Sequence, residues 1–167
     1  SLFTSVIPNV LVNGIAHAIR FSPAVKVYVC NVTTQRGETD SFRAVDHVQA
    51  LHDHVGGPLV DYVLVNNNFE PSRRIDPALG IAPVSLDGID RLQDVGVILR
   101  DVVCDEQPMR HDPAKLSTAL LEIVREAKST ARTADAGEVR EPAAISGVMG
   151  GMATPAVADA RRRVSRQ

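Results

Sequence analysis

The sequence predicts an α/β fold, in which a mostly parallel sheet built from Rossmann-like βαβ units lies between two layers of helices. Residues 25–30 and 62–65 are short valine-rich runs with the character of buried strands. Between them, residues 42–52 carry apolar side chains at helical spacing. A strand, a helix and a second strand in this order predict one right-handed crossover.

The first half of the chain contains two predicted helical segments. Residues 5–20 are expected to be helical in two pieces, because Asn13 and Gly14 interrupt an otherwise apolar face. The second segment follows the first strand and a polar loop. Either Asp40 or Ser41 is expected to cap its amino end, since both side chains can accept a hydrogen bond from a free backbone N–H.

The second half is predicted to hold two more strands and one long helix. Residues 69–82 contain prolines and charges without periodicity, which is typical of a loop over the carboxyl edge of a sheet. Residues 83–86 and 95–99 are predicted to be short strands. Asp112 and Pro113 predict the start of the last helix, because aspartate caps well and proline suits the first helical position.

Composition bounds the domain organisation and the class of protein. The chain has 167 residues, about one domain, and 44% of them are apolar. We expect residues 1–128 to form the α/β part and residues 129–167 a low-complexity, disordered tail. A net charge of −2 with mixed signs gives no electrostatic footprint for nucleic acid or a membrane surface. Without a signal peptide or an apolar run of ~18 residues, a cytoplasmic location is expected.

The polar loop after the first strand is the best candidate for a ligand site. Open α/β sheets bind ligands beyond the carboxyl ends of their strands, where amides and hydroxyls can bind a sugar and a glycine lets backbone approach phosphate. By residue type alone, a capped turn that binds nothing is equally well supported. We interpret Asp40 as an acceptor for a sugar hydroxyl, a helix cap or an outer partner of Mg²⁺. The candidates are Asn31, Thr33, Thr34, Gly37, Thr39 and Asp40.

Two motifs resemble the CofD/YvcK family. They are SLFTSVIPNVLV at residues 1–12 and VYVCNVTTQRGETD at residues 27–40, with Asp46 and His47 following. The family includes gluconeogenesis factors, to whose YvcK branch these motifs are closer, and 2-phospho-L-lactate transferases. A glycine-rich amino-terminal half precedes the first motif in the family. The resemblance therefore implies that the fold is incomplete here and that the chain is the carboxyl-terminal portion of a longer protein.

The resemblance also implies ligand contacts outside the polar loop. Thr4 and Ser5 match family residues beside the ligand cleft, although a plain helix cap is nearly as well supported. Arg110 lies in a segment where the YvcK branch has an arginine on the diphosphate of a sugar nucleotide. A guanidinium suits that role because it pairs with phosphate oxygens and stays charged.

The resemblance implies a non-catalytic regulatory protein that binds a UDP-sugar such as UDP-N-acetylglucosamine. The branch is linked to carbon metabolism, cell-wall synthesis and cell shape. Two alternatives stay open. One is a 2-phospho-L-lactate transferase-like enzyme that acts on a deazaflavin, with Mg²⁺ near Asp40. The other is a truncated chain that binds no small molecule and pairs with a second copy as a homo-oligomer.

Overall fold

The computed structural model describes residues 1–12 and 14–134, and its centre is a three-stranded parallel sheet in the order β1–β2–β3. Strand β1 (Val27–Val29) pairs with β2 (Tyr62–Asn66), and β2 pairs with β3 (Gly96–Arg100). All three strands lie within one residue of runs that the sequence predicts to be extended. The parallel sheet with helices on its faces confirms the predicted α/β class.

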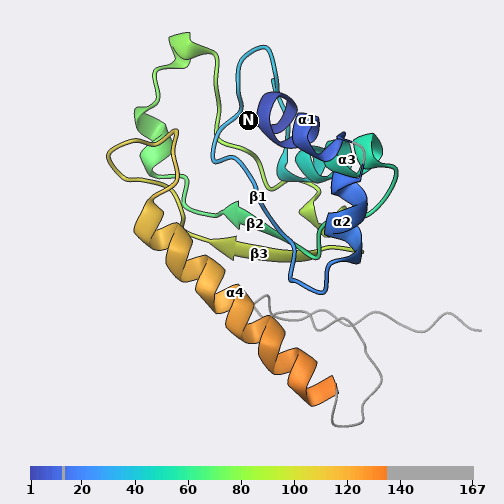
Figure 1. Ribbon diagram of the computed structural model, residues 1–167. Helices are drawn as coiled ribbons and strands as arrows, with labels where there is room; N and C mark the ends of the chain where they lie inside the picture. The colour runs from blue at the N-terminus through green and yellow to red at the C-terminus, as the bar shows by residue number, and fades with distance from the viewer. Residues whose placement is uncertain (13, 135–167) are drawn as a thin grey trace, which may run out of the picture.

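Helices cover both faces of the sheet, with α1, α2 and α3 on one side and α4 on the other (Figure 1). Successive strand residues point to opposite faces, so Val63 and Val65 pack under the first layer while Leu64 packs under α4. The helical elements are the π-helix Leu2–Val6, α1 (Ile7–Val10), α2 (Ile15–Phe21), α3 (Ala44–Val55), the 3-10 turns Pro71–Arg74, Pro77–Leu79 and Ile89–Arg91, and α4 (Pro113–Ala134).

The first helical segment is broken between Val10 and Ile15, as the sequence predicts. Gly14 precedes α2 with φ of 89°, a left-handed conformation that glycine adopts without a steric penalty. Within residues 1–12 and 14–134, no single helix has the length and apolarity to cross a membrane. The pair Leu2–Val10 and Ile15–Phe21 meets that test only when taken together across a bend of 80°.

Helix α3 begins later than predicted, so the expected cap at Asp40 or Ser41 is wrong. A turn over residues 36–41 comes first, with φ of 77° at Gly37 and 60° at Ser41. The helix then starts at Ala44. The side chain of Asp46 accepts a hydrogen bond from the Arg43 N–H at 2.8 Å and two from its guanidinium at 2.8 and 2.9 Å. These charge-assisted bonds lower the pKa of the Asp46 carboxyl.

Residues 83–86 do not form the predicted strand of the main sheet. They make only isolated bridges, from Pro83 to Thr33 and from Ser85 to Arg43. The segment instead crosses beside the loop that follows β1, where the Val84 N–H donates to the Val32 carbonyl at 3.1 Å. Because proline offers no N–H to a neighbouring strand, this segment closes a loop and does not extend the sheet.

Helix α4 starts where the sequence predicts. Asp112 Oδ1 accepts hydrogen bonds from the N–H groups of Ala114 and Lys115 at 2.8 and 2.9 Å, with Pro113 at the first helical position. The helix continues through Ala134. Residues 129–134 of the expected tail 129–167 are therefore helical, and its remaining residues, 135–167, lie outside the described residues.

The side chain of Arg100, the last residue of β3, covers part of the edge of β3 that faces away from β2. The Gly96 N–H donates to the Asp61 carbonyl, and the Arg100 carbonyl accepts from the Asn67 N–H, so both backbones face β2. Alternation along the strand turns the backbone of Leu99 to the open edge. There its carbonyl accepts a hydrogen bond from Arg100 Nη1 at 3.0 Å, while Arg100 Nε lies 3.3 Å from a carboxylate oxygen of Glu122.

Candidate functional site

The loop after β1 is built around three buried threonines, Thr33, Thr34 and Thr39. Thr34 is 5% exposed, and its hydroxyl accepts a hydrogen bond from the Ala82 N–H at 2.9 Å. Thr39 is completely buried, and its hydroxyl accepts from the Gln35 N–H, also at 2.9 Å. These two hydroxyls therefore fix the shape of the loop from inside.

The other predicted residues of this loop lie nearer its surface. Asp40 is exposed, and its carboxylate accepts a hydrogen bond from the Gly37 N–H at 2.7 Å. Asn31 is half-buried at the end of β1 and donates from its amide to the side chain of Gln35 at 3.0 Å. Asn31, Gly37 and Asp40 are thus the predicted residues of the loop that are at least partly exposed.

Glu38 joins this loop to the first helical turn. Its carboxylate accepts hydrogen bonds from the Phe3 N–H at 2.8 Å and from the Ser1 hydroxyl. Burial alone would raise the pKa of this carboxyl, but the bonds from Ser1 and Phe3 outweigh that effect and the pKa is lowered. Thr4 and Ser5 are exposed beside this contact, and the Thr4 N–H donates to Ser1 Oγ at 3.1 Å. Two stretches that the sequence singles out separately therefore meet at Glu38.

Arg110 belongs to the return arm of a hairpin between β3 and α4. Residues 102–104 run antiparallel to residues 110–112, with a bridge between Val103 and His111. The His111 ring reaches across the carboxyl end of the sheet, and its Nε2 donates to the Cys30 carbonyl at 3.1 Å. Arg110 is exposed, and within the described residues its guanidinium makes no hydrogen bond or ion pair. The hairpin thus brings the backbone of the return arm to the end of β1, while the guanidinium of Arg110 is exposed.

Asn66 ties the end of β2 to the same hairpin. It is 5% exposed, its side-chain oxygen accepts from the Val102 N–H at 3.2 Å, and its amide donates to the Asn68 carbonyl at 2.6 Å. The sequence reasoning did not select Asn66 or Glu38 as site residues. Asn66 could have been selected because it is the first polar residue after the predicted strand 62–65. Glu38 offered no such signal, because a carboxylate repels the phosphate expected at this loop.

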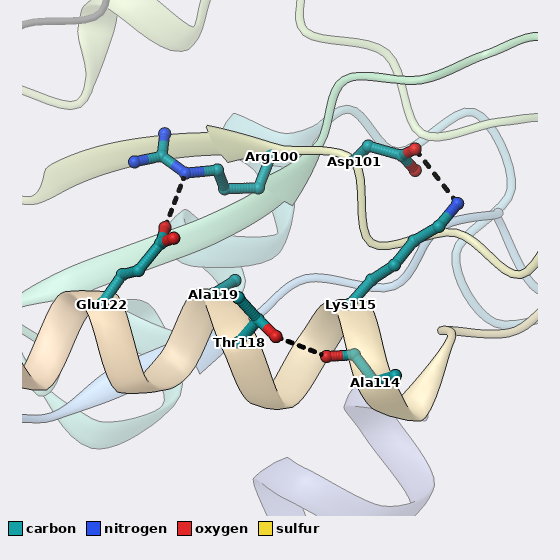
Figure 2. Close-up of a pocket in the computed structure, with 7 residues that line it drawn as sticks. All are labelled: Arg100, Asp101, Ala114, Lys115, Thr118, Ala119 and Glu122. Carbon is teal, nitrogen blue, oxygen red and sulfur yellow. Dashed lines mark hydrogen bonds and ion pairs between the residues drawn. The ribbon is translucent and has the colours of Figure 1, made fainter.

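The structure also contains a cavity of about 450 Å³, and it lies away from this loop (Figure 2). The cavity is between the end of β3 and the first turns of α4. Its charges are paired with one another, with Lys115 at 3.0 Å from Asp101 and Arg100 bonded to Glu122. In the part of the chain that the structure describes, no group of three or more histidine, cysteine, aspartate or glutamate residues is placed to hold a metal ion.

The fold and these contacts define a Rossmann-like α/β domain whose polar loops gather at the carboxyl ends of parallel strands. A family model described as 2-phospho-L-lactate transferase CofD matches residues 1–103. The chain therefore belongs to the CofD family, which confirms the resemblance seen in its two motifs.

Relatives within this family are named gluconeogenesis factors. One from Halalkalibacterium halodurans is 43% identical over 133 residues, which are 73% of this chain and 39% of that protein. Another from Bacillus subtilis is 39% identical over 131 residues, with 75% and 41% covered. The crystal structure of a UPF0052-family protein from Bacillus halodurans matches with a TM-score of 0.66 and 42% identity, over 72% of this chain and 40% of that one. The chain thus spans about two fifths of the length of these proteins.

Proposed function

We propose that this chain forms one wall of a binding site for a nucleotide sugar, UDP-N-acetylglucosamine, in a non-catalytic regulatory protein. Its role would be that of a gluconeogenesis factor, linked to carbon metabolism, cell-wall synthesis and cell shape. The supporting observation is the hydrogen bond from His111 Nε2 to the Cys30 carbonyl at 3.1 Å. This contact fixes the arm that carries Arg110 at the end of β1, the strand that leads into the polar loop.

Each proposed ligand residue has a role that its position allows. The guanidinium of Arg110 pairs with the diphosphate oxygens. The amide of Asn31 and the backbone at Gly37 meet the sugar and the phosphates at the strand end. Thr4, whose hydroxyl is bonded to Ser1 Oγ, and Ser5 are both exposed, and their hydroxyls contact ribose or phosphate.

The remaining members of the proposed site act mainly through the shape of the loop. Thr34 and Thr39 hold it from inside, and Thr33 is buried beside them. Asp40 closes the turn at Gly37 and presents its second carboxylate oxygen to a sugar hydroxyl. No bond of the ligand is broken in this reading.

Calorimetry on the full chain tests the proposal. We expect heat of binding with UDP-N-acetylglucosamine, and Arg110→Ala should weaken binding by about 10- to 100-fold, the value of a charge-assisted hydrogen bond. Arg125→Ala is the matched control, because Arg125 is an exposed arginine on α4, far along the chain from the loop. Equal affinities for the Arg110 and Arg125 variants would contradict the assignment.

The family model's description favours a second candidate, a phospholactyl transferase acting on a deazaflavin. That chemistry needs carboxylates that hold Mg²⁺ at the transferred phosphate. The described residues do not fit this need, since the Asp40 carboxylate is bonded to the Gly37 N–H and no acidic cluster accompanies it. Turnover of a deazaflavin with a phospholactyl donor would establish the enzyme. If calorimetry shows no binding, the turnover assay shows no product and analytical ultracentrifugation shows a dimer, pairing with a second copy is favoured.

A further inference from the structure

We infer that His111 is a positioning residue, which fastens the return arm of the hairpin, and with it the backbone of Arg110, to the end of β1 without touching the ligand itself. The part of this inference that concerns affinity rests on the proposed function. The part that concerns the hairpin rests on contacts within the chain.

The two ends of the contact differ in rigidity. Cys30 is completely buried, and its N–H donates to the Leu64 carbonyl of β2 at 3.0 Å, so its carbonyl is a fixed point of the sheet. The hairpin is attached to β3, which is not a neighbour of β1. His111 therefore crosses the end of β2 to fasten the return arm to the far strand.

Backbone bonds carry this attachment to Arg110. The Arg110 carbonyl accepts from the Cys104 N–H at 2.9 Å, and the Asp112 N–H donates to the Val102 carbonyl at 2.8 Å, one on each side of His111. The guanidinium of Arg110 has no partner of its own among residues 1–12 and 14–134. Its location is thus set only by its backbone, and an unfastened hairpin would have to be ordered again when a ligand binds.

The test compares two substitutions of His111. In His111→Gln the amide nitrogen takes the place of Nε2 and keeps the donor, while His111→Leu keeps much of the volume and loses it. We expect His111→Leu to weaken the binding of UDP-N-acetylglucosamine by about 3- to 10-fold, the range of one neutral hydrogen bond. The His111→Gln chain should bind with the affinity of the wild type. His17→Gln, on the exposed surface of α2, is the control and should change nothing.

A double-mutant cycle distinguishes positioning from a separate contact. If His111 acts through Arg110, then His111→Leu causes no further loss in a chain that already carries Arg110→Ala. Losses that add fully would overturn the inference. Should His111→Leu not fold, His111→Asn replaces it, because its shorter amide stops short of the position of Nε2.

Hydrogen exchange on the free chain decides the hairpin without any ligand. The amides of Cys104 and Asp112 should exchange faster in His111→Leu than in the wild type and His111→Gln, because the return arm opens more often. Unchanged exchange at both amides would refute the positioning role. If the wild type binds no UDP-N-acetylglucosamine, the proposed function fails, and the exchange comparison still tests the fastening of Arg110.

Discussion

Gly96 of β3 lies directly beside the ring of Tyr62 on β2, its partner in the strand register. A Cβ added at Gly96 would lie 2.4 Å from Tyr62 Cδ1 and 2.6 Å from Cε1, well inside van der Waals contact. The ring must therefore move by about 1 Å, which costs about 1–3 kcal/mol as overpacking. Replacing glycine also restricts the unfolded chain, which recovers about 0.4–1 kcal/mol. Gly96→Ala should lower the free energy of unfolding by roughly 0.5–2 kcal/mol.

Urea denaturation followed by circular dichroism measures this effect in a cycle with Tyr62→Val. Apart from the ring, no atom lies closer to the added methyl group than the Asp61 carbonyl oxygen at 3.5 Å, an ordinary contact. Gly96→Ala should then stabilise the Tyr62→Val chain by about 0.4–1 kcal/mol, so its effect changes sign between the two backgrounds. A stabilising effect in the wild type, or the same loss in both backgrounds, would refute the steric argument.

Two further predictions concern buried polar groups. Asn66→Leu leaves the Val102 N–H without its acceptor and should cost about 1–3 kcal/mol in urea denaturation; an unchanged midpoint would show that this bond contributes nothing. Burial lowers the pKa of His47, whose Nε2 has no hydrogen-bond partner, so the folded state prefers the neutral ring. Its stabilising contribution is complete above the unfolded pKa of about 6.5 and is lost as the pH falls from there toward the lowered folded pKa. His47→Phe should flatten this part of the stability profile, and equal pH dependence in both proteins would contradict the assignment.

Local sequence signals account well for the strands and for the last helix. The valine-rich runs place β1 and β2, and Asp112 with Pro113 marks the start of α4, because these signals act through adjacent backbone groups. The start of α3 was not predictable in the same way. Its cap depends on Arg43 and Asp46, while Ser41 adopts a positive φ that serine rarely takes.

The candidate site could be predicted only where it is local. Residue types identified the loop after β1 as polar and glycine-containing. They did not show that its threonines are buried, or that the hydroxyl of Thr39 accepts a hydrogen bond from the backbone of the loop itself. The place of the hairpin arm that carries Arg110 depends on the hydrogen bond from His111 to Cys30, residues that are 81 positions apart. The link through Glu38 likewise spans 35 positions to Phe3, so no periodicity reports it.

The hydrogen bond from the guanidinium of Arg100 to the Leu99 carbonyl affects how readily two copies of this chain can associate through the edge of β3. A foreign strand that approaches this side must first displace that group and its tie to Glu122, so stacking of chains into longer sheets is discouraged there. An apolar residue in place of Arg100 would leave the backbone amides and carbonyls of this edge uncovered. We then expect the protein to aggregate during expression.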